Sequence, residues 1–234
     1  VESHNFHVFM DDNPACLPDE RFKAVAATWQ KLYTLVSPDG LHWRKVQEDP
    51  AAVTGHFDTL NVCFWDKVTQ RYRLFTRLNQ GVRQIQSCES TDFRQWTAPV
   101  LHRYDDELGR IQFYTNATTP CPGAEHILLS FPKRFLPDRH TPSEGMVYAS
   151  KGGVSDTLLM SSRDGQLWHR WPEAWVRPGR DPRNWTHRSN MMAPGIFEFS
   201  PGEWSLYISE HYGWPDNRLR RLTIRRHGMV SLAA

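Results

Sequence analysis

The 234-residue sequence predicts an all-β chain, and two observations carry this prediction. Aromatic residues are frequent, with 10 Trp, 12 Phe and 7 Tyr, and so are turn formers, with 14 Gly and 16 Pro. This composition is typical of short strands joined by tight turns rather than of long helices. The second observation is a turn motif that recurs along the chain and marks repeated units.

The recurring motif is Ser-x-Asp followed four residues after the Asp by Trp, each time directly after an apolar strand. Its copies span residues 37–43, 90–96 and 162–168. The Asp carboxylate can accept backbone N–H groups across such a turn, and the Gly that follows Asp in two copies supplies positive φ. The Trp can then pack on the outgoing strand. The motif therefore predicts three equivalent strand-to-strand connections.

The predicted strands fall into four groups of about 45 to 70 residues, each a small antiparallel meander, which is typical of propeller blades. They cover residues 22–27 and 31–36; 60–65, 71–77 and 84–89; 111–115, 126–131 and 157–161; and 195–199, 204–209 and 218–224. We therefore expect one β-propeller domain over residues 1–234, five-bladed, with four blades legible. Residues 5–10 build part of the fifth blade, or that blade is lost because the chain is a fragment. A β-sandwich is the alternative.

Two longer segments, 132–153 and 171–189, interrupt the repeat and are expected on the functional face. The second group is the most complete. In its strand 71–77, Tyr72 and Leu74 alternate with Arg73, Phe75 and Arg77, which predicts two faces in different environments.

Several function classes have no support in the sequence. The net charge of +2 and the lack of a basic run argue against a nucleic-acid partner, and no apolar stretch is long enough to span a membrane. The cysteines form no CxxC pair, and His4, His7 and His56 match no standard metal spacing, so neither a metal site nor an organic cofactor is expected. A structural calcium or other ion in the axial channel stays open, as do the compartment and the oligomeric state.

Polar residues gather at the starts of the innermost predicted strands. They include Asn5, Asp58 with Asn61, Tyr114 with Asn116, and Arg188 with Asn190. Inner strands of a propeller border its central channel, so these side chains are expected to converge. Acids from different blades can then face one substrate, which is what hydrolysis of a glycosidic bond requires.

A resemblance to a known group supports this interpretation. The segments NFHVFMDDNP, DERFKA, HFDTLNVCFWDKVTQRYRLFTR, SSRDGQLWHRW and RPGRDPRNWTHRSN resemble uncharacterised bacterial proteins related to the five-bladed propeller glycoside hydrolases of families 32, 43 and 68. The resemblance covers most of the chain, and it implies a carbohydrate substrate. The glycoside hydrolases of this group use three acids from successive blades.

The resemblance assigns those three acids here. Asp11 matches the base or nucleophile, Asp58 matches the second, orienting Asp, and Glu210 is the first choice for the acid. The short Glu-containing motif that carries the acid in the characterised families is absent from this sequence. The alternatives that stay open are Asp12 for the first acid, and Glu125 or Glu20 for the third.

The expected activity is therefore that of a glycoside hydrolase working through an Asp/Glu pair in the axial pocket. Two alternatives stay open: a non-catalytic propeller that binds glycans or proteins, and a sialidase-like enzyme in which Arg21, Arg77 and Arg188 hold a carboxylate near Tyr114. Trp65 and Trp214 are candidates for stacking on a sugar. The expected substrate-binding residues are Asn5, Arg21, Asn61, Arg77, Asn116, Arg188, Asn190 and His211.

Overall fold

A computed structural model describes residues 4–142, 144–147 and 152–230. Within these residues the chain is all-β, as predicted, and its only helical elements are two 3-10 turns, η1 (Pro18–Glu20) and η2 (Pro182–Asn184). Part of the interrupting segment 132–153, namely residues 143 and 148–151, lies outside the described residues. In the described part, no helix is long and apolar enough to cross a membrane.

The first two groups of strands each form a four-stranded antiparallel sheet whose strands pair in chain order. Unit I consists of β1 (His4–Met10), β2 (Phe22–Ala27), β3 (Leu32–Ser37) and β4 (Arg44–Lys45). Unit II consists of β5 (Val62–Asp66), β6 (Arg71–Asn79), β7 (Arg83–Ser90) and β8 (Val100–Leu101). Residues 5–10 therefore open unit I and do not build a separate sheet.

Unit III is larger, because a second sheet of order β10-β13-β14 branches from its main sheet of order β11-β12-β15-β16-β9. Its strands are β9 (Arg103–Tyr104), β10 (Phe113–Thr115), β11 (Thr119–Cys121), β12 (Ala124–Ser130), β13 (Lys133–Leu136), β14 (Val154–Thr157), β15 (Met160–Ser162) and β16 (Leu167–Arg170). The extra sheet contains the first part of the interrupting segment.

Unit IV has an interrupted inner strand. It consists of β17 (Met191–Met192), β18 (Phe197–Ser200), β19 (Glu203–Glu210) and β20 (Arg218–Arg225). Both β17 and β18 pair with β19 on the edge opposite β20, so they are two pieces of one strand that breaks around Pro194. A proline has no N–H to give to a sheet ladder, which explains the break.

Consecutive units pack against each other through separate apolar clusters. One joins units I and II around Val25 and Leu74, one joins units II and III around Phe75 and Trp168, and one joins units III and IV around Leu129. Both faces of β6 are consequently buried, since unit II lies between two neighbours. The two faces do differ in environment, as predicted, because Tyr72 and Leu74 pack against unit I and Phe75 packs against unit III, but both faces are buried.

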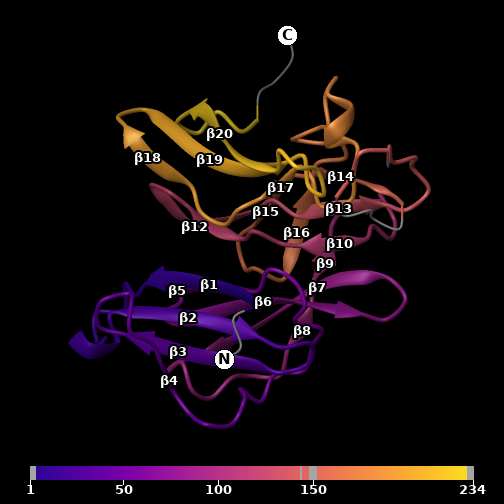
Figure 1. Cartoon of the computed structure of the whole chain (residues 1–234). Coiled ribbons are helices and arrows are strands. Elements are labelled where there is room, and N and C mark those ends of the chain that lie inside the picture. Colours follow the sequence, from indigo (N-terminus) through magenta and orange to yellow (C-terminus); the bar gives the residue numbers. More distant parts are fainter. Residues whose placement is uncertain (1–3, 143, 148–151, 231–234) are drawn as a thin grey trace.

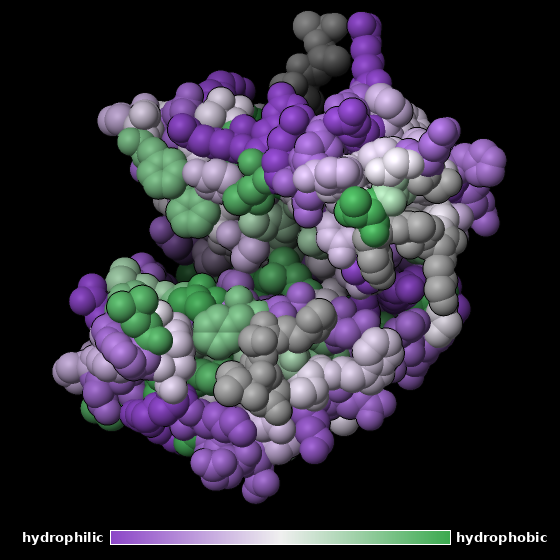
Figure 2. Space-filling model, viewed as in Figure 1, coloured by the Kyte–Doolittle hydropathy of each residue, from purple (hydrophilic) through white to green (hydrophobic). Residues whose placement is uncertain are grey.

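Units I and II form the lower half of the molecule in Figure 1, and units III and IV form the upper half. The molecule is open on the side where β1 and β18 lie, and Figure 2 shows a hollow there with apolar surface on both edges. The large apolar side chains exposed on these two strands are Phe6, Val8 and Met10 of β1, and Phe197 and Phe199 of β18.

The recurring Ser-x-Asp turns connect the third and fourth strands of the main sheets in units I, II and III. In each copy one Asp oxygen accepts two backbone N–H groups at 2.8 Å, as Asp164 does from Gln166 and Leu167. Trp168 is fully buried, whereas Trp43 and Trp96 are half-buried. The predicted turn chemistry is confirmed, and its role is to hold the fold.

Candidate functional site

All four units contribute to one pocket of about 620 Å³, which lies at the starts of their inner strands. We call it the central pocket. Its lining residues are Asn5, Thr28 and Trp29 from unit I; Asp58, Thr59 and Leu60 ahead of β5; Tyr114 and Thr115 from β10; and Arg188, Met191, Met192, Ala193, Pro194, Ser209, Tyr212 and Leu219 from unit IV. Of the expected site residues, Asn5, Asp58 and Arg188 lie in this lining.

Asp58 is the one carboxylate among the lining residues that the structure describes. Its side chain forms an ion pair with Arg77 of β6, which is only 5% exposed. The remaining donors of that guanidinium, Nε and Nη1, are buried and have no hydrogen-bond partner among the described residues. Asn5 likewise places a buried amide nitrogen without such a partner at the pocket.

Four cationic side chains surround the Tyr114 ring, and we call them the cation cluster: Arg77, Arg83, Lys133 and Arg188. The Lys133 ammonium lies 3.9 Å from the ring centroid, and the guanidinium carbons lie 5.0 to 5.7 Å from it. The cations come from β6, β7, β13 and the loop before β17. Such contacts are favourable because the ring face is electron-rich.

The cation cluster is partly desolvated, and its members repel one another. Lys133 is fully buried, and burial lowers its pKa well below the usual range, with further lowering by Arg188, Arg83 and Arg77. Its ammonium lies 3.3 Å from Nδ1 of His187, whose pKa burial and Lys133 lower to about 2. Burial is the larger cause of both shifts, and the neighbouring positive charges add to it.

Three expected substrate-binding residues form hydrogen bonds to the protein's own backbone. They are Asn61, Asn116 and Asn190. Each is at most 2% exposed, and each donates its side-chain amide to two backbone carbonyls. Asn116, for example, donates to the carbonyls of Leu60 and Phe75 in unit II. The asparagines that recur ahead of the inner strands therefore fix the loops that shape the pocket, and their side chains lie outside its lining.

Asp11 does not lie in the central pocket, contrary to the expectation. Its fully buried carboxylate lies 2.8 Å from the Lys23 ammonium and accepts a hydrogen bond of 2.7 Å from the Tyr72 hydroxyl. Because a strand rises about 3.3 Å per residue, Asp11 is roughly 20 Å from Asn5, which starts the same strand at the pocket. The sequence places Asp11 beside the strand without showing which end of it faces the pocket.

Glu210 also lies outside the pocket lining. It is nearly buried, and it accepts hydrogen bonds from Nε of Arg218 at 2.8 Å and Nη1 of Arg220 at 2.9 Å. Burial alone would raise the pKa of this carboxyl, but the two arginines outweigh it and lower the pKa. A protonated acid was expected here, and the neighbouring strand β20 favours the ionised form.

The remaining candidates lie elsewhere. Arg21 packs over Phe22 at the far end of β1, and His211 is buried with its ring nitrogens 2.8 Å from Asp181 and Asp216. Asp12 and Glu20 form ion pairs outside the pocket. The other three candidates outside the pocket lining are Glu125, Trp65 and Trp214.

Three functional candidates are missing from the sequence-based set: Trp29, Arg83 and Lys133. Trp29 lies at the pocket in the turn between β2 and β3, and it is 63% exposed. Its position between two predicted strands, where a turn is expected to be exposed, was the signal that the sequence offered. Arg83 and Lys133 are ordinary strand residues in the sequence. Only the packing of β13 beside β10 brings Lys133 under the Tyr114 ring.

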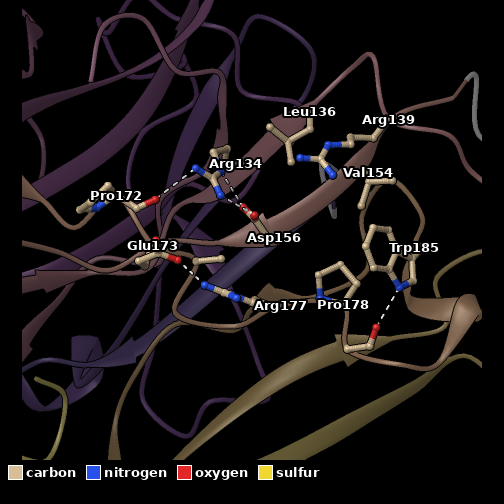
Figure 3. A pocket seen from close by; sticks show the side chains of 12 residues that line it. Arg134, Leu136, Arg139, Val154, Asp156, Pro172, Glu173, Arg177, Pro178 and Trp185 are labelled. Atoms are coloured by element: carbon tan, nitrogen blue, oxygen red, sulfur yellow. Dashed lines mark hydrogen bonds and ion pairs between the residues drawn. The ribbon is translucent and has the colours of Figure 1, made fainter. Parts of the chain in front are cut away.

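A second pocket, of about 490 Å³, lies beside β13 and β14 of unit III (Figure 3). Two of its three arginines are paired with acids: Arg134 binds Asp156 through two hydrogen bonds of 2.9 and 2.6 Å, and Arg177 pairs with Glu173. The Trp185 indole donates to the Gly179 carbonyl. Because most of its charge is compensated and its lining comes from unit III and the segment that follows it, this pocket is a weaker candidate than the central pocket.

Among the described residues, no group of three or more His, Cys, Asp and Glu side chains is placed to hold a metal ion. The polar side chains at the central pocket are cationic, amide, hydroxyl or aromatic, apart from the carboxylate of Asp58. This donor set suits an anionic or hydroxyl-rich organic ligand better than a metal cation.

Solved structures with a similar fold are carbohydrate-active proteins. A thermostable family-43 glycoside hydrolase matches 95% of this chain and 68% of its own, with 11% identity and a TM-score of 0.62. An N-acetylgalactosamine deacetylase from F. plautii matches 96% of this chain and 74% of its own, with 13% identity and a TM-score of 0.59. An endo-1,4-beta-xylanase from Bacteroides thetaiotaomicron matches 95% and 68%, with 12% identity and a TM-score of 0.56.

No protein-family model and no curated protein sequence matches the chain. On the basis of the structural similarities alone, the chain has the fold of family-43 and related glycoside hydrolases. The neighbours include a deacetylase as well as glycosidases, so the chemistry has to be argued from the site.

Proposed function

We propose that the protein is a carbohydrate-binding propeller whose central pocket holds a saccharide. We infer that units I to IV are four blades of a five-position propeller, with the open side between β1 and β18 at the fifth position. The observation that carries the functional proposal is the central pocket itself, to which all four units contribute. Its exposed Trp29, the Tyr114 ring and several polar groups are the side chains that sugar recognition uses.

Hydrolysis of a glycosidic bond is the second candidate, and the glycosidases among the structural neighbours favour it. Hydrolysis by the usual route needs two carboxyl groups, about 5 to 10 Å apart, across the bound bond. Asp58 is the single acid among the described lining residues, and it is paired with Arg77. For this reason we rank binding ahead of hydrolysis.

The proposal is tested by calorimetric titration of neutral and acidic oligosaccharides into the protein. Trp29→Ala is expected to weaken binding about tenfold, because a stacking aromatic contributes more than 1 kcal/mol at a binding hot spot. Trp185→Ala is the matched control, since Trp185 is an exposed tryptophan of the second pocket. Equal loss in both variants, or no saccharide binding by the wild-type protein, would reject the central pocket as a sugar site.

A release assay for new reducing ends separates the two candidates. If the wild-type protein hydrolyses an oligosaccharide and Asp58→Asn does not, the protein is a glycosidase. Binding without hydrolysis would establish the binding module.

A further inference from the structure

We infer that the central pocket contains an oxyanion subsite beside Tyr114, so that the saccharide it takes is an acidic one. The inference rests on the proposed function and names its substrate class. A sugar carboxylate or sulfate and free inorganic phosphate share the same recognition chemistry, which is a compact group of negative oxygens facing several cations.

The arrangement of the cations is the first support. The pocket-lining Tyr114 is flanked by Arg77, Lys133 and Arg188, which belong to three different units. Arg188 itself lines the pocket. Cations brought together from separate units repel one another, and a bound oxyanion would relieve that repulsion.

The missing counter-charge is the second support. Of Arg77, Arg83 and Lys133, Arg77 alone has an ion-pair partner among the described residues, and that partner is Asp58. Lys133 is fully buried, and Arg77 keeps two buried donors without a partner there. Buried charges normally require compensating charge nearby, so this excess of positive charge beside Tyr114 favours a negative group on the pocket side of the ring, where Arg188 also lies.

Buried arginines elsewhere in the chain show the contrast. Arg170 is 3% exposed and donates to both Asp106 carboxylate oxygens through Nε and Nη2, and Arg73 pairs with Asp66 and Glu89. Buried arginines with a purely structural role are therefore paired with acidic side chains in this fold. Two members of the cation cluster, Arg83 and Lys133, depart from that rule, since neither has an ion-pair partner among the described residues.

A purely structural role is the competing explanation, in which the cations only hold the Tyr114 ring in place. The two explanations differ for Lys133→Met, which keeps most of the side-chain length and removes the charge. If Lys133 serves a ligand, its replacement should leave the melting temperature of the free protein unchanged or raised, because an unpaired buried charge is removed. If it serves structure, the melting temperature should fall.

The experiment titrates four probes at constant ionic strength: trigalacturonate, its neutral counterpart galactotriose, inorganic phosphate and inorganic sulfate. Wild-type protein is expected to bind trigalacturonate at least tenfold more tightly than galactotriose. Lys133→Met and Arg188→Gln are each expected to remove at least tenfold of that preference. Arg177→Gln, which removes an exposed arginine at the second pocket, is the control and should leave the preference intact.

The outcomes distinguish the oxyanion subsite from the saccharide site. Equal binding of both trisaccharides overturns the oxyanion subsite and still supports the central pocket as a saccharide site. Binding of phosphate or sulfate alone, lost in Lys133→Met, supports the subsite and makes a free inorganic anion its occupant. A preference for trigalacturonate that survives both cluster variants overturns the assignment to these cations, and binding of no probe overturns the subsite.

Discussion

Asp58 and Arg77 are joined in an ion pair at the central pocket, and this pair connects the pocket's carboxylate to the cation cluster. Asp58 lies ahead of β5, whereas Arg77 is near the end of β6, so the two strands of one hairpin deliver both charges. The guanidinium carbon lies 5.0 Å from the centroid of the Tyr114 ring. Arg77 thus contacts both Asp58 of its own unit and the Tyr114 ring of unit III.

Asp58→Asn is therefore expected to lower the free energy of unfolding by about 1 to 3 kcal/mol, because it leaves Arg77 buried without its counter-charge. Urea denaturation measures the effect. Glu203→Gln is the control, since the Glu203–Arg221 pair is more than 40% exposed on both sides and exposed pairs contribute about 1 kcal/mol or less. Equal losses in the two variants would show that burial of Arg77 does not matter.

A second prediction compares two glycines of the repeated turn. Gly40 and Gly165 occupy the same place and have φ of +77° and +75°, so an added methyl group is strained equally in both. The new Cβ would meet the Phe22 ring at an ordinary 3.7 Å in Gly40→Ala, but it would collide with the Arg73 guanidinium in Gly165→Ala.

Arg73 cannot withdraw freely, because it is 2% exposed and donates to the Asp164 carbonyl at 2.6 Å. Gly165→Ala should therefore destabilise the protein by about 1 to 3 kcal/mol more than Gly40→Ala does, as for other overpacked sites. Melting curves of the two variants provide the comparison. A smaller loss in Gly165→Ala than in Gly40→Ala would contradict the contact.

A third prediction concerns Asn190, which has φ of +58° and donates to two backbone carbonyls. Asn190→Ala leaves both carbonyls without this donor and places alanine in the left-handed region, so a loss of about 2 to 4 kcal/mol is expected. Asn79→Ala removes an exposed asparagine and should change stability by less than about 0.5 kcal/mol. Chemical denaturation measures both, and a loss in Asn190→Ala no larger than that in Asn79→Ala would refute the structural role.

The local parts of the fold were predictable because their signals are local. The Ser-x-Asp turns need only neighbours within a few residues, as the hydrogen bonds of Asp39 to Leu41 and His42 illustrate. The site was less predictable, because its members come from different units. Asp58 could be identified from its place ahead of an inner strand.

Asp11 and Lys133 show where sequence reasoning fails here. Asp11 follows β1, a strand that does reach the central pocket, but it lies at the end of β1 that points away from the pocket. Which end of a strand faces a pocket depends on how all the units pack together. Lys133 looks like a solvated strand residue, yet the pairing of β13 with β10 buries it under Tyr114. A local pattern contains no information about either relationship.

The last prediction concerns pH and the buried His102. Burial, followed by nearby Arg73, lowers the pKa of this histidine to about 3 from an ordinary 6.5. Its ring stacks on Trp168 with centroids 5.3 Å apart, and its Nε2 lies 3.2 Å from the Ser87 hydroxyl oxygen. The folded protein therefore holds the ring neutral at pH values where the unfolded chain protonates it.

Because the unfolded chain binds the extra proton, this group's contribution is fully present above pH 6.5 and is lost as pH falls toward 3. As the pH is lowered from 6 to 4, one such histidine decreases the free energy of unfolding by about 1.4 kcal/mol for each pH unit. His102→Gln should reduce the measured slope by that amount, whatever its effect at neutral pH. His126→Gln, which replaces an exposed histidine, is the control variant. An unaltered slope in His102→Gln would mean that His102 takes up its proton in the folded state, with Ser87 and Trp168 moving to admit water.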